Sequence, residues 1–218
     1  MAKRFELLVF DWDGTLMDSA AAIVEAIQAA CHDLQLTPPT DEQARHVIGL
    51  GLVDAMRHAV PELNEADYSR MVDRYRHHYL ARDHELRLFA GAAEMIDDLA
   101  AAGYILAVAT GKSRLGLNRA LKVSGIGAYF HDSRCADECF SKPHPQMLQE
   151  LMDGFGVEPG QSLMIGDTSH DLMMANNAGV ASVAVSYGAH PVENLDACSP
   201  LARVGSIGAL HSWLKINA

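Results

Sequence analysis

Four short apolar runs recur along the chain and alternate with longer stretches of helical character. The runs are Phe5–Phe10, Ile105–Thr110, Leu163–Ile165 and Ala181–Ser186. The helix-like stretches are Ala92–Ala102, Ser113–Ser124, Pro145–Phe155 and His170–Ala178. Runs that are apolar at consecutive positions are typical of parallel strands buried on both faces. The alternation therefore predicts an α/β fold with a doubly wound parallel sheet.

Residues 17–87 break this alternation, because they contain helix-like segments and no convincing strand. The signals for helices are a possible cap at Asp18 or Ser19, a capping-box pattern at Thr40 and Gln43, and an amphipathic stretch over Tyr68–Leu80. We therefore expect an α/β core domain of residues 1–16 and 88–218, and an α-helical cap domain of residues 17–87 inserted after the first strand. Hinges between them are expected near residues 16–18 and 86–89.

Composition excludes some classes of function. The chain has 218 residues, 49% of them hydrophobic, and a formal net charge of −11. Such a negative charge argues against nucleic acid as a partner. The start of the chain contains no apolar segment long enough for a signal peptide or a membrane span, so a cytoplasmic location and no membrane partner are expected. The four scattered cysteines are expected to be reduced.

The first apolar run ends in a pair of carboxylates, Asp11 and Asp13, followed by Gly14 and Thr15. At a strand rise of ~3.3 Å per residue, the backbones of Asp11 and Asp13 lie about 6 to 7 Å apart, so both can reach one small polar ligand. Two such carboxylates suit a hard cation and nucleophilic or acid/base chemistry. An ordinary strand followed by an Asp-Gly turn remains the alternative on this segment alone.

Two further segments carry groups that could bind phosphate. Thr110 and Gly111 stand at the end of the second strong strand, where a hydroxyl and backbone amides precede a helix. The following Gly-Lys-Ser letters do not form a nucleotide-binding P-loop, because Leu106 occupies the position of the required first glycine. Lys142 lies just before Pro143 in a stiff segment, although a solvated surface lysine is the alternative there.

The third strand repeats the logic of the first. Asp167 follows its apolar residues, and Asp171 comes one helical turn later. Asp171 can stabilise the N-terminus of the next helix or support a metal-bound water. In open α/β sheets, ligands bind at the carboxyl ends of the strands, and all of these polar groups fall there. We therefore expect them to form one site.

In chain order, these segments resemble the four motifs of the haloacid dehalogenase superfamily. The matching segments are Asp11-Trp12-Asp13-Gly14-Thr15, Thr110, Lys142-Pro143 and Gly166-Asp167-Thr168-Ser169-His170-Asp171. The resemblance covers nearly the whole chain. It implies a Rossmann-like core, and the helical insertion is similar to the cap of the phosphoglycolate phosphatase and β-phosphoglucomutase type.

The resemblance also implies roles for the site residues. Asp11 would attack phosphorus to form an aspartyl-phosphate, and Asp13 would act as general acid and then general base. Thr110 and Lys142 would bind phosphoryl oxygens. Mg²⁺ would be held by Asp11, the backbone carbonyl of Asp13 and Asp167, with Asp171 behind a bound water. The remaining expected phosphate- or substrate-binding residues are Trp12 and Gly111 in the core and Arg45 and Gly49 in the cap.

Departures from related branches narrow the expected reaction. The superfamily's dehalogenases lack the second aspartate, which is present here as Asp13, and its phosphonate hydrolases use a cap lysine, whereas residues 17–87 contain none. Mutases of this type tend to carry an arginine near Leu52. We therefore expect a phosphatase acting on a small phosphorylated metabolite, with phosphoglycolate favoured.

Several alternatives stay open at this point. They are a sugar-phosphate phosphatase or phosphomutase, a nucleotide or pyrophosphate hydrolase, and a non-catalytic scaffold. A receiver-like phosphoacceptor domain is disfavoured by the helical insertion. Whether the protein is a monomer or a homodimer is not decided by the sequence.

Overall fold

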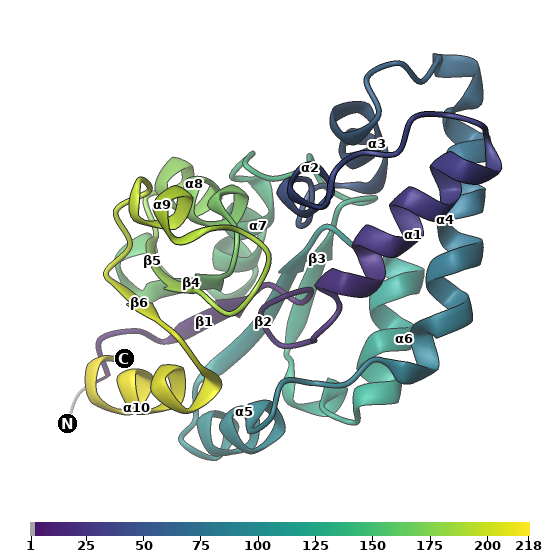
Figure 1. The fold of residues 1–218 in the computed structure, drawn as a ribbon. Coiled ribbons are helices and arrows are strands. Elements are labelled where there is room, and N and C mark those ends of the chain that lie inside the picture. Colours follow the sequence, from purple (N-terminus) through teal and green to yellow (C-terminus); the bar gives the residue numbers. More distant parts are fainter. Residues whose placement is uncertain (1–2) are drawn as a thin grey trace.

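The computed structural model describes residues 3–218 and contains a six-stranded, wholly parallel sheet (Figure 1). The strands are β1 (Leu7–Phe10), β2 (Ile105–Thr110), β3 (Asp132–Cys135), β4 (Ser162–Gly166), β5 (Ala181–Val185) and β6 (Ala202–Val204). Their order in the sheet is β3-β2-β1-β4-β5-β6. The chain thus winds outward in both directions from β1, as a doubly wound sheet does. The fold predicted from the alternation of strands and helices is confirmed.

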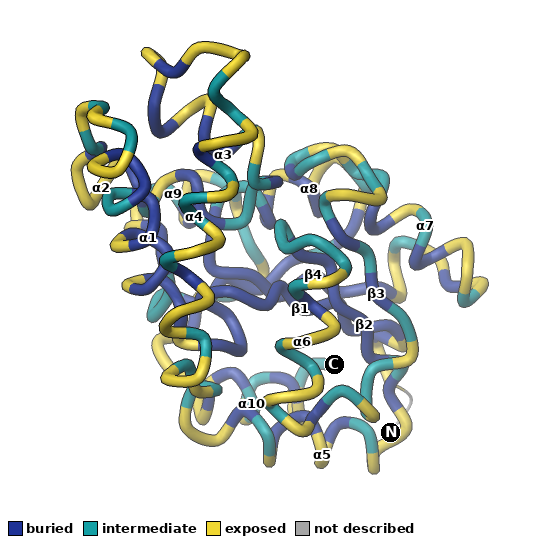
Figure 2. The backbone as a smooth tube through the Cα atoms, turned by 90° about the vertical axis from the view of Figure 1, so that its right-hand side faces the viewer, coloured by how far each residue is buried: buried dark blue, intermediate teal, exposed yellow. Residues whose placement is uncertain are grey.

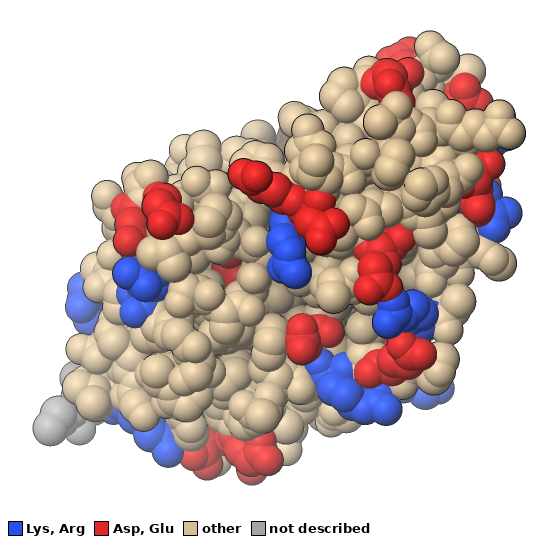
Figure 3. Space-filling model, viewed as in Figure 1, with Lys and Arg blue, Asp and Glu red and all other residues tan. Residues whose placement is uncertain are grey.

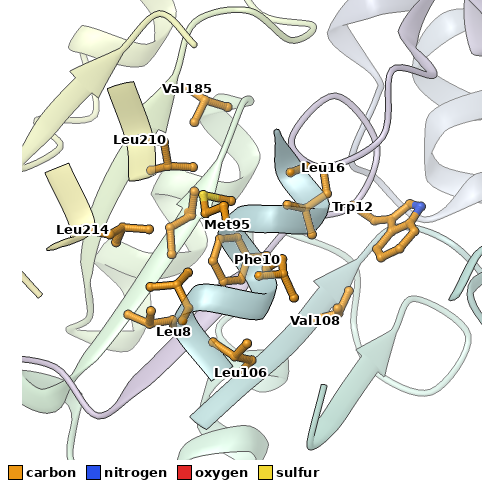
Figure 4. Packing of buried hydrophobic residues seen from close by; sticks show 14 of the residues in the cluster. Leu8, Phe10, Trp12, Leu16, Met95, Leu106, Val108, Val185, Leu210 and Leu214 are labelled. Carbon is orange, nitrogen blue, oxygen red and sulfur yellow. The ribbon is translucent and has the colours of Figure 1, made fainter. Parts of the chain in front are cut away.

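Helices cover both faces of the sheet. They are α5 (Ala92–Ala101), α6 (Arg114–Ser124), α7 (Gln146–Phe155), α8 (Ser169–Ala178), α9 (Val192–Asp196) and α10 (Ile207–Asn217). Successive residues of a strand point to opposite faces, so Leu8 and Phe10 of β1 pack with α5 and α10, whereas Leu7 and Val9 pack with α7 and α8. Figure 4 shows the first of these layers. The strands are buried on both sides, which explains their continuous apolar character.

Four further helices form a separate layer beside the sheet. They are α1 (Ala20–Asp33), α2 (Asp41–His46), α3 (Leu52–Ala59) and α4 (Tyr68–Arg82). They share a hydrophobic cluster of their own, which includes Ile27, Met56 and Met71, and α1 and α4 lie side by side along it (Figures 1 and 2). The predicted capping box of Thr40 and Gln43 is present at the start of α2. Short 3-10 turns occur at Glu65–Asp67, Asp83–Glu85, Gly127–Tyr129 and Pro159–Gln161.

The two segments that lead into and out of these four helices run side by side. Asp18 N–H donates to the Arg87 carbonyl at 3.0 Å, and Phe89 N–H donates to the Leu16 carbonyl at 2.9 Å. An antiparallel bridge joins Met17 to Leu88 between them. The cap boundaries at residues 17–87 and the hinges remain predictions, and this paired ribbon lies where the hinges are expected.

The sequence does not predict strands β3 and β6, and both lie at the edges of the sheet.

Among residues 3–218, no helix is long and apolar enough to cross a membrane. On the face shown in Figure 3, acidic and basic side chains are interspersed over the surface.

Candidate active site

The carboxyl ends of the central strands bring the predicted polar residues together. Asp11 follows β1, Thr110 ends β2 and Asp167 follows β4. Lys142 comes from the loop between β3 and α7, and Asp171 lies in the first turn of α8. All five side chains are buried. The four sequence segments therefore meet at one edge of the sheet, between the core and the four-helix layer.

Lys142 is the centre of a buried ion-pair network. Its Nζ donates to Oδ1 of Asp11 and to Oδ1 of Asp171, both at 2.6 Å. Burial alone would lower the pKa of Lys142, but the two carboxylates outweigh it and raise that pKa above its ordinary value. The prediction that Lys142 is a fixed ammonium at this site, and not a solvated surface lysine, agrees with this geometry.

Burial raises the pKa of the carboxylates, whereas it lowers that of the lysine. Burial raises the pKa of Asp11 well above its ordinary value; the attraction of Lys142 opposes this rise, and repulsion from Asp171 and Asp167 adds to it. Burial and the nearby Asp171 raise the pKa of Asp167 to about 7. Asp167 accepts hydrogen bonds from Thr15 Oγ1 at 2.8 Å and from the Ala189 N–H at 2.7 Å. The site thus concentrates more negative charge than Lys142 alone offsets.

The donor set fits a magnesium ion. One carboxylate oxygen each from Asp11, Asp167 and Asp171 lies within 4.8 Å of the others. Oδ2 of Asp11 is buried and has no hydrogen-bond partner among the described residues. Hard divalent cations prefer such oxygen ligands, and a cation here would satisfy the unpartnered oxygen. The Asp13 side chain is not part of this cluster, which is consistent with the expectation that Asp13 contributes only its backbone carbonyl.

Asp171 stabilises the N-terminus of α8, which is one of the two roles predicted for it, and also binds Lys142, which neither role included. Its side chain accepts hydrogen bonds from the N–H and the hydroxyl of Thr168, and together they form a capping box at the start of α8. Its other oxygen binds Lys142. The same carboxylate therefore fixes the helix end and positions the lysine.

The Asp13 side chain lies outside the acidic cluster and is held by other residues. Its Oδ1 accepts a hydrogen bond from Ser19 Oγ at 2.6 Å and forms an ion pair with Lys112 Nζ at 3.0 Å. Lys112 Nζ also donates to the Tyr79 hydroxyl of α4 at 2.9 Å. The carboxylates of Asp11 and Asp13 are thus held by different lysines. Sequence reasoning missed Ser19, Lys112 and Tyr79 as site residues.

Glycines keep the space around the carboxylates clear. A Cβ at Gly14 or Gly188 would overlap the Asp167 carboxylate, and a Cβ at Gly166 would overlap the Asp171 side chain. Gly14 has φ +83°, a left-handed conformation that favours glycine. The turn after β1 therefore needs glycine both for its backbone and for the approach of Asp167.

The α2–α3 loop, taken from the last residue of α2, His46, to Gly51 before α3, contacts the core beside the site through its main chain. His170 Nε2 and His190 Nε2 donate to the His46 carbonyl at 2.7 and 3.0 Å. The Gly51 N–H donates to Ser141 Oγ at 2.8 Å. A Cβ on Gly111 would lie 2.6 Å from the Gly49 carbonyl oxygen. The core and the loop therefore meet at contact distance.

The other predicted binding residues occupy different places. Gly49 and Gly111 both line the cavity between core and cap, whereas Arg45 does not. Thr110 is fully buried, and its Oγ1 accepts a hydrogen bond from the Lys112 N–H. The Trp12 side chain packs in the core (Figure 4). The centroid of its ring is 6.4 Å from that of Phe130. A phosphate contact of Trp12 would therefore come from its backbone.

Comparison with known proteins agrees with this arrangement. The family model for haloacid dehalogenase-like hydrolases matches residues 8–185. A probable phosphatase, IndB, of Dickeya dadantii is 35% identical over 97% of this chain and 96% of its own. A phosphoglycolate phosphatase of Agrobacterium fabrum is 33% identical over 84% of this chain and 81% of its own.

Solved structures show the same fold. The crystal structure of a predicted phosphoglycolate phosphatase from Haemophilus somnus has a TM-score of 0.88 at 27% identity, and the match covers 100% of both chains. The family match spans all four motif segments that form the buried site. The chain therefore belongs to the haloacid dehalogenase-like hydrolases and is an enzyme of their phosphatase branch.

Proposed function

We propose that the protein is a Mg²⁺-dependent phosphatase that hydrolyses a phosphomonoester through an aspartyl-phosphate on Asp11. The observation that carries this proposal is the environment of Asp11. One of its oxygens is held by Lys142, while the other is buried without a partner beside Asp167 and Asp171. A fixed carboxylate with a free oxygen is the form that nucleophilic attack requires.

The first half of the reaction forms a bond between Asp11 and phosphorus and breaks the ester P–O bond. Lys142, hydrogen-bonded to Asp11, would stabilise its ionised form, which must supply the electron pair. Thr110, at the end of β2, would bind a phosphoryl oxygen. When bound, Mg²⁺ supplies positive charge that offsets the carboxylates and the phosphoryl oxygens. Its ligands would be Asp11, Asp167 and the Asp13 carbonyl, with Asp171 behind a coordinated water.

Asp13 transfers the proton in both half-reactions. As the P–O bond breaks, its carboxyl group gives a proton to the leaving alcohol. In the second half, its carboxylate takes a proton from water as the water attacks the aspartyl-phosphate and restores Asp11. Ser19 and Lys112 hold this carboxylate on the cap side of the site, away from Lys142. Asp11 therefore serves as the nucleophile, and Asp13 transfers the protons.

The substrate class is the finer part of the proposal. Phosphoglycolate is the substrate favoured by the sequence, and relatives of this chain carry the name phosphoglycolate phosphatase. Others are named as a pyrophosphatase and a 5'-nucleotidase at 28% identity. Retention of every motif residue supports catalysis over a non-catalytic scaffold. A cytoplasmic location belongs to the same proposal.

Phosphate release from a panel of phosphomonoesters, with and without Mg²⁺, tests the reaction. Wild-type protein should release phosphate only with Mg²⁺, and Asp11→Asn should abolish release because asparagine cannot attack phosphorus. Asp153→Asn, an exposed change on α7, is the matched control and should retain activity. Equal release by the wild-type and Asp11→Asn proteins would contradict the proposal.

A further inference from the structure

The cavity on the cap side of Asp13 is built for a particular kind of leaving group. We propose that the substrate is the phosphate ester of an uncharged alcohol carrying a flat apolar ring, and not of a small acid such as glycolate. This inference rests on the proposed phosphatase function and specifies the substrate class of the same site, where it departs from phosphoglycolate, the substrate that the sequence favours. It follows from the size, the lining and the charge of the cavity.

The cavity begins where the leaving oxygen would be. Asp13 and Lys112 line it, whereas Asp11 and Lys142 do not. Since Asp13 protonates the leaving alcohol, the body of that alcohol extends from Asp13 into this space. The cavity volume is about 370 Å³. That lies within the range of about 300–1,000 Å³ typical of sites for drug-sized ligands, and a two-carbon acid would leave most of it unfilled.

The walls of the cavity are mostly apolar. The apolar side chains come from α1, α3 and α4 and from the α2–α3 loop, and they include Ile23, Ile27, Val47, Leu52, Met56 and Val72. Two aromatic rings, Tyr75 and Tyr79 of α4, stand in the same wall, with ring centroids 5.7 Å apart and planes inclined by 19°. A flat ring can stack or pack edge-on against such a pair, and its burial is favourable.

The charged groups of the cavity oppose an acidic leaving group. Four carboxylates line it, Asp13, Asp54, Asp83 and Asp137, against three cations, Arg76, Lys112 and Arg119. Each of these cations has an acidic partner: Lys112 pairs with Asp13 at 3.0 Å, Arg119 with Asp83 at 3.7 Å and Arg76 with Asp73 at 4.0 Å.

The N-termini of α3 and α6 also border the cavity and contribute positive potential. Each already has a carboxylate beside it: the first turn of α3 contains Asp54, and the Arg114 N–H at the start of α6 donates to Oδ1 of Asp137 at 2.9 Å. A carboxylate on the substrate would therefore enter a cavity whose lining carries a net negative charge. An uncharged ring pays no such electrostatic cost, and the apolar wall favours it.

Three esters separate the effect of the ring from that of the charge. Methyl phosphate has a small uncharged leaving group, phosphoglycolate a small charged one and benzyl phosphate an uncharged ring, and their alcohols have similar acidity. We expect kcat/KM for benzyl phosphate to exceed that for either of the others at least about tenfold, since a single buried methylene is worth about 10-fold or more in a hydrophobic pocket. Isothermal titration of Asp11→Asn protein should give the same order of affinities without turnover.

A cavity-filling substitution tests the location. Val72→Phe places a larger side chain in the cavity wall and should lower the ratio of kcat/KM for benzyl phosphate to that for methyl phosphate at least about tenfold. Val123→Phe, at an exposed position of α6 that is not part of the cavity lining, is the matched control and should leave the ratio unchanged.

The outcomes distinguish the two proposals. A preference for phosphoglycolate in both kcat/KM and affinity, or an unchanged ratio in folded Val72→Phe protein, would overturn the ring-binding inference and leave the phosphatase intact. Absence of Asp11-dependent release from all three esters would overturn the phosphatase proposal. The affinities of the Asp11→Asn protein would then still decide whether the cavity prefers a ring.

Discussion

Replacing Lys142 by methionine should lower the free energy of unfolding far more than replacing a surface lysine does. The Lys142 side chain is fully buried, and its Nζ is 2.6 Å from the carboxylates of both Asp11 and Asp171. Methionine keeps the apolar stem but removes the only cation that pairs with these groups in the described structure. Removing one partner of a buried ion pair costs about 3–5 kcal/mol, because an uncompensated charge remains.

Protonation sets an independent bound on this cost. Without Lys142, Asp11 can take up a proton and become neutral. Protonating a carboxyl group of ordinary pKa 3.8 at pH 7 costs about 4 kcal/mol, at about 1.36 kcal/mol per pH unit. The two figures agree. The cost should be smaller at pH 5, because neutralising the carboxylate there costs about 1.4 kcal/mol less for each pH unit. Since the pKa of Lys142 is raised above 10.5, its stabilisation of the native protein is complete at both pH values and is lost only as the pH rises through the raised pKa.

Urea unfolding in EDTA at pH 7 and pH 5 measures this directly. Lys215→Met is the matched control, because Lys215 pairs with Asp98 on the surface; its free energy of unfolding should be unchanged. Added Mg²⁺ should restore part of the stability of Lys142→Met, since the ion binds only the native state. Equal effects of the two substitutions in EDTA would refute the reasoning.

Three further predictions follow from the contacts around the site. Gly111→Ala should lower kcat/KM about 100-fold while leaving the midpoint of urea unfolding nearly unchanged, because its Cβ would meet the Leu50 carbonyl and hold the loop off the core; unchanged kinetics would contradict this. Burial, and then the neighbouring His170, lower the pKa of His190 from 6.5 to about 4. As the pH falls from 6.5 to 4, calorimetry should therefore show that the wild-type protein loses about 3 kcal/mol of stability relative to His190→Asn, since the carboxylates of the site contribute equally to both proteins. Lys112→Met should reduce kcat about 100-fold, because the carboxylate of Asp13 loses the ion pair that holds it. Phosphate release measures this, and the control, Lys122→Met, should keep its activity.

The sequence predicts the central strands because burial on both faces demands continuous apolar residues. Strand β3 lacks this apolar pattern and is therefore not predicted. Its residues, Asp-Ser-Arg-Cys, alternate between partly and fully buried positions because β3 is an edge strand. Strand β6 is the other edge and has only three residues, Ala202–Val204. Both lie too close to solvent to carry the apolar signal.

The site divides in a similar way. Asp11 and Asp167 are predictable because each directly follows an apolar strand, and strand ends converge in a parallel sheet. Ser19 is predicted as a helix cap, and it does occupy the N-cap position of α1, but its hydroxyl binds Asp13 instead of a helix N–H. The pairing of Lys112 with Tyr79 joins core to cap and has no local signal. Such contacts depend on how the two layers pack.

The hydrogen bonds between the α2–α3 loop and the core have one property in common: on the loop side, they use only peptide groups. The His46 carbonyl accepts from two core histidines, and the Gly51 N–H donates to Ser141. A peptide group is present whatever side chain a residue carries. Mutation of the neighbouring cavity-lining side chains can therefore change which alcohol is accommodated without removing these attachments. Selectivity and closure are separable traits in this fold, so directed evolution of new substrates should begin with the cap side chains and leave the loop glycines unaltered.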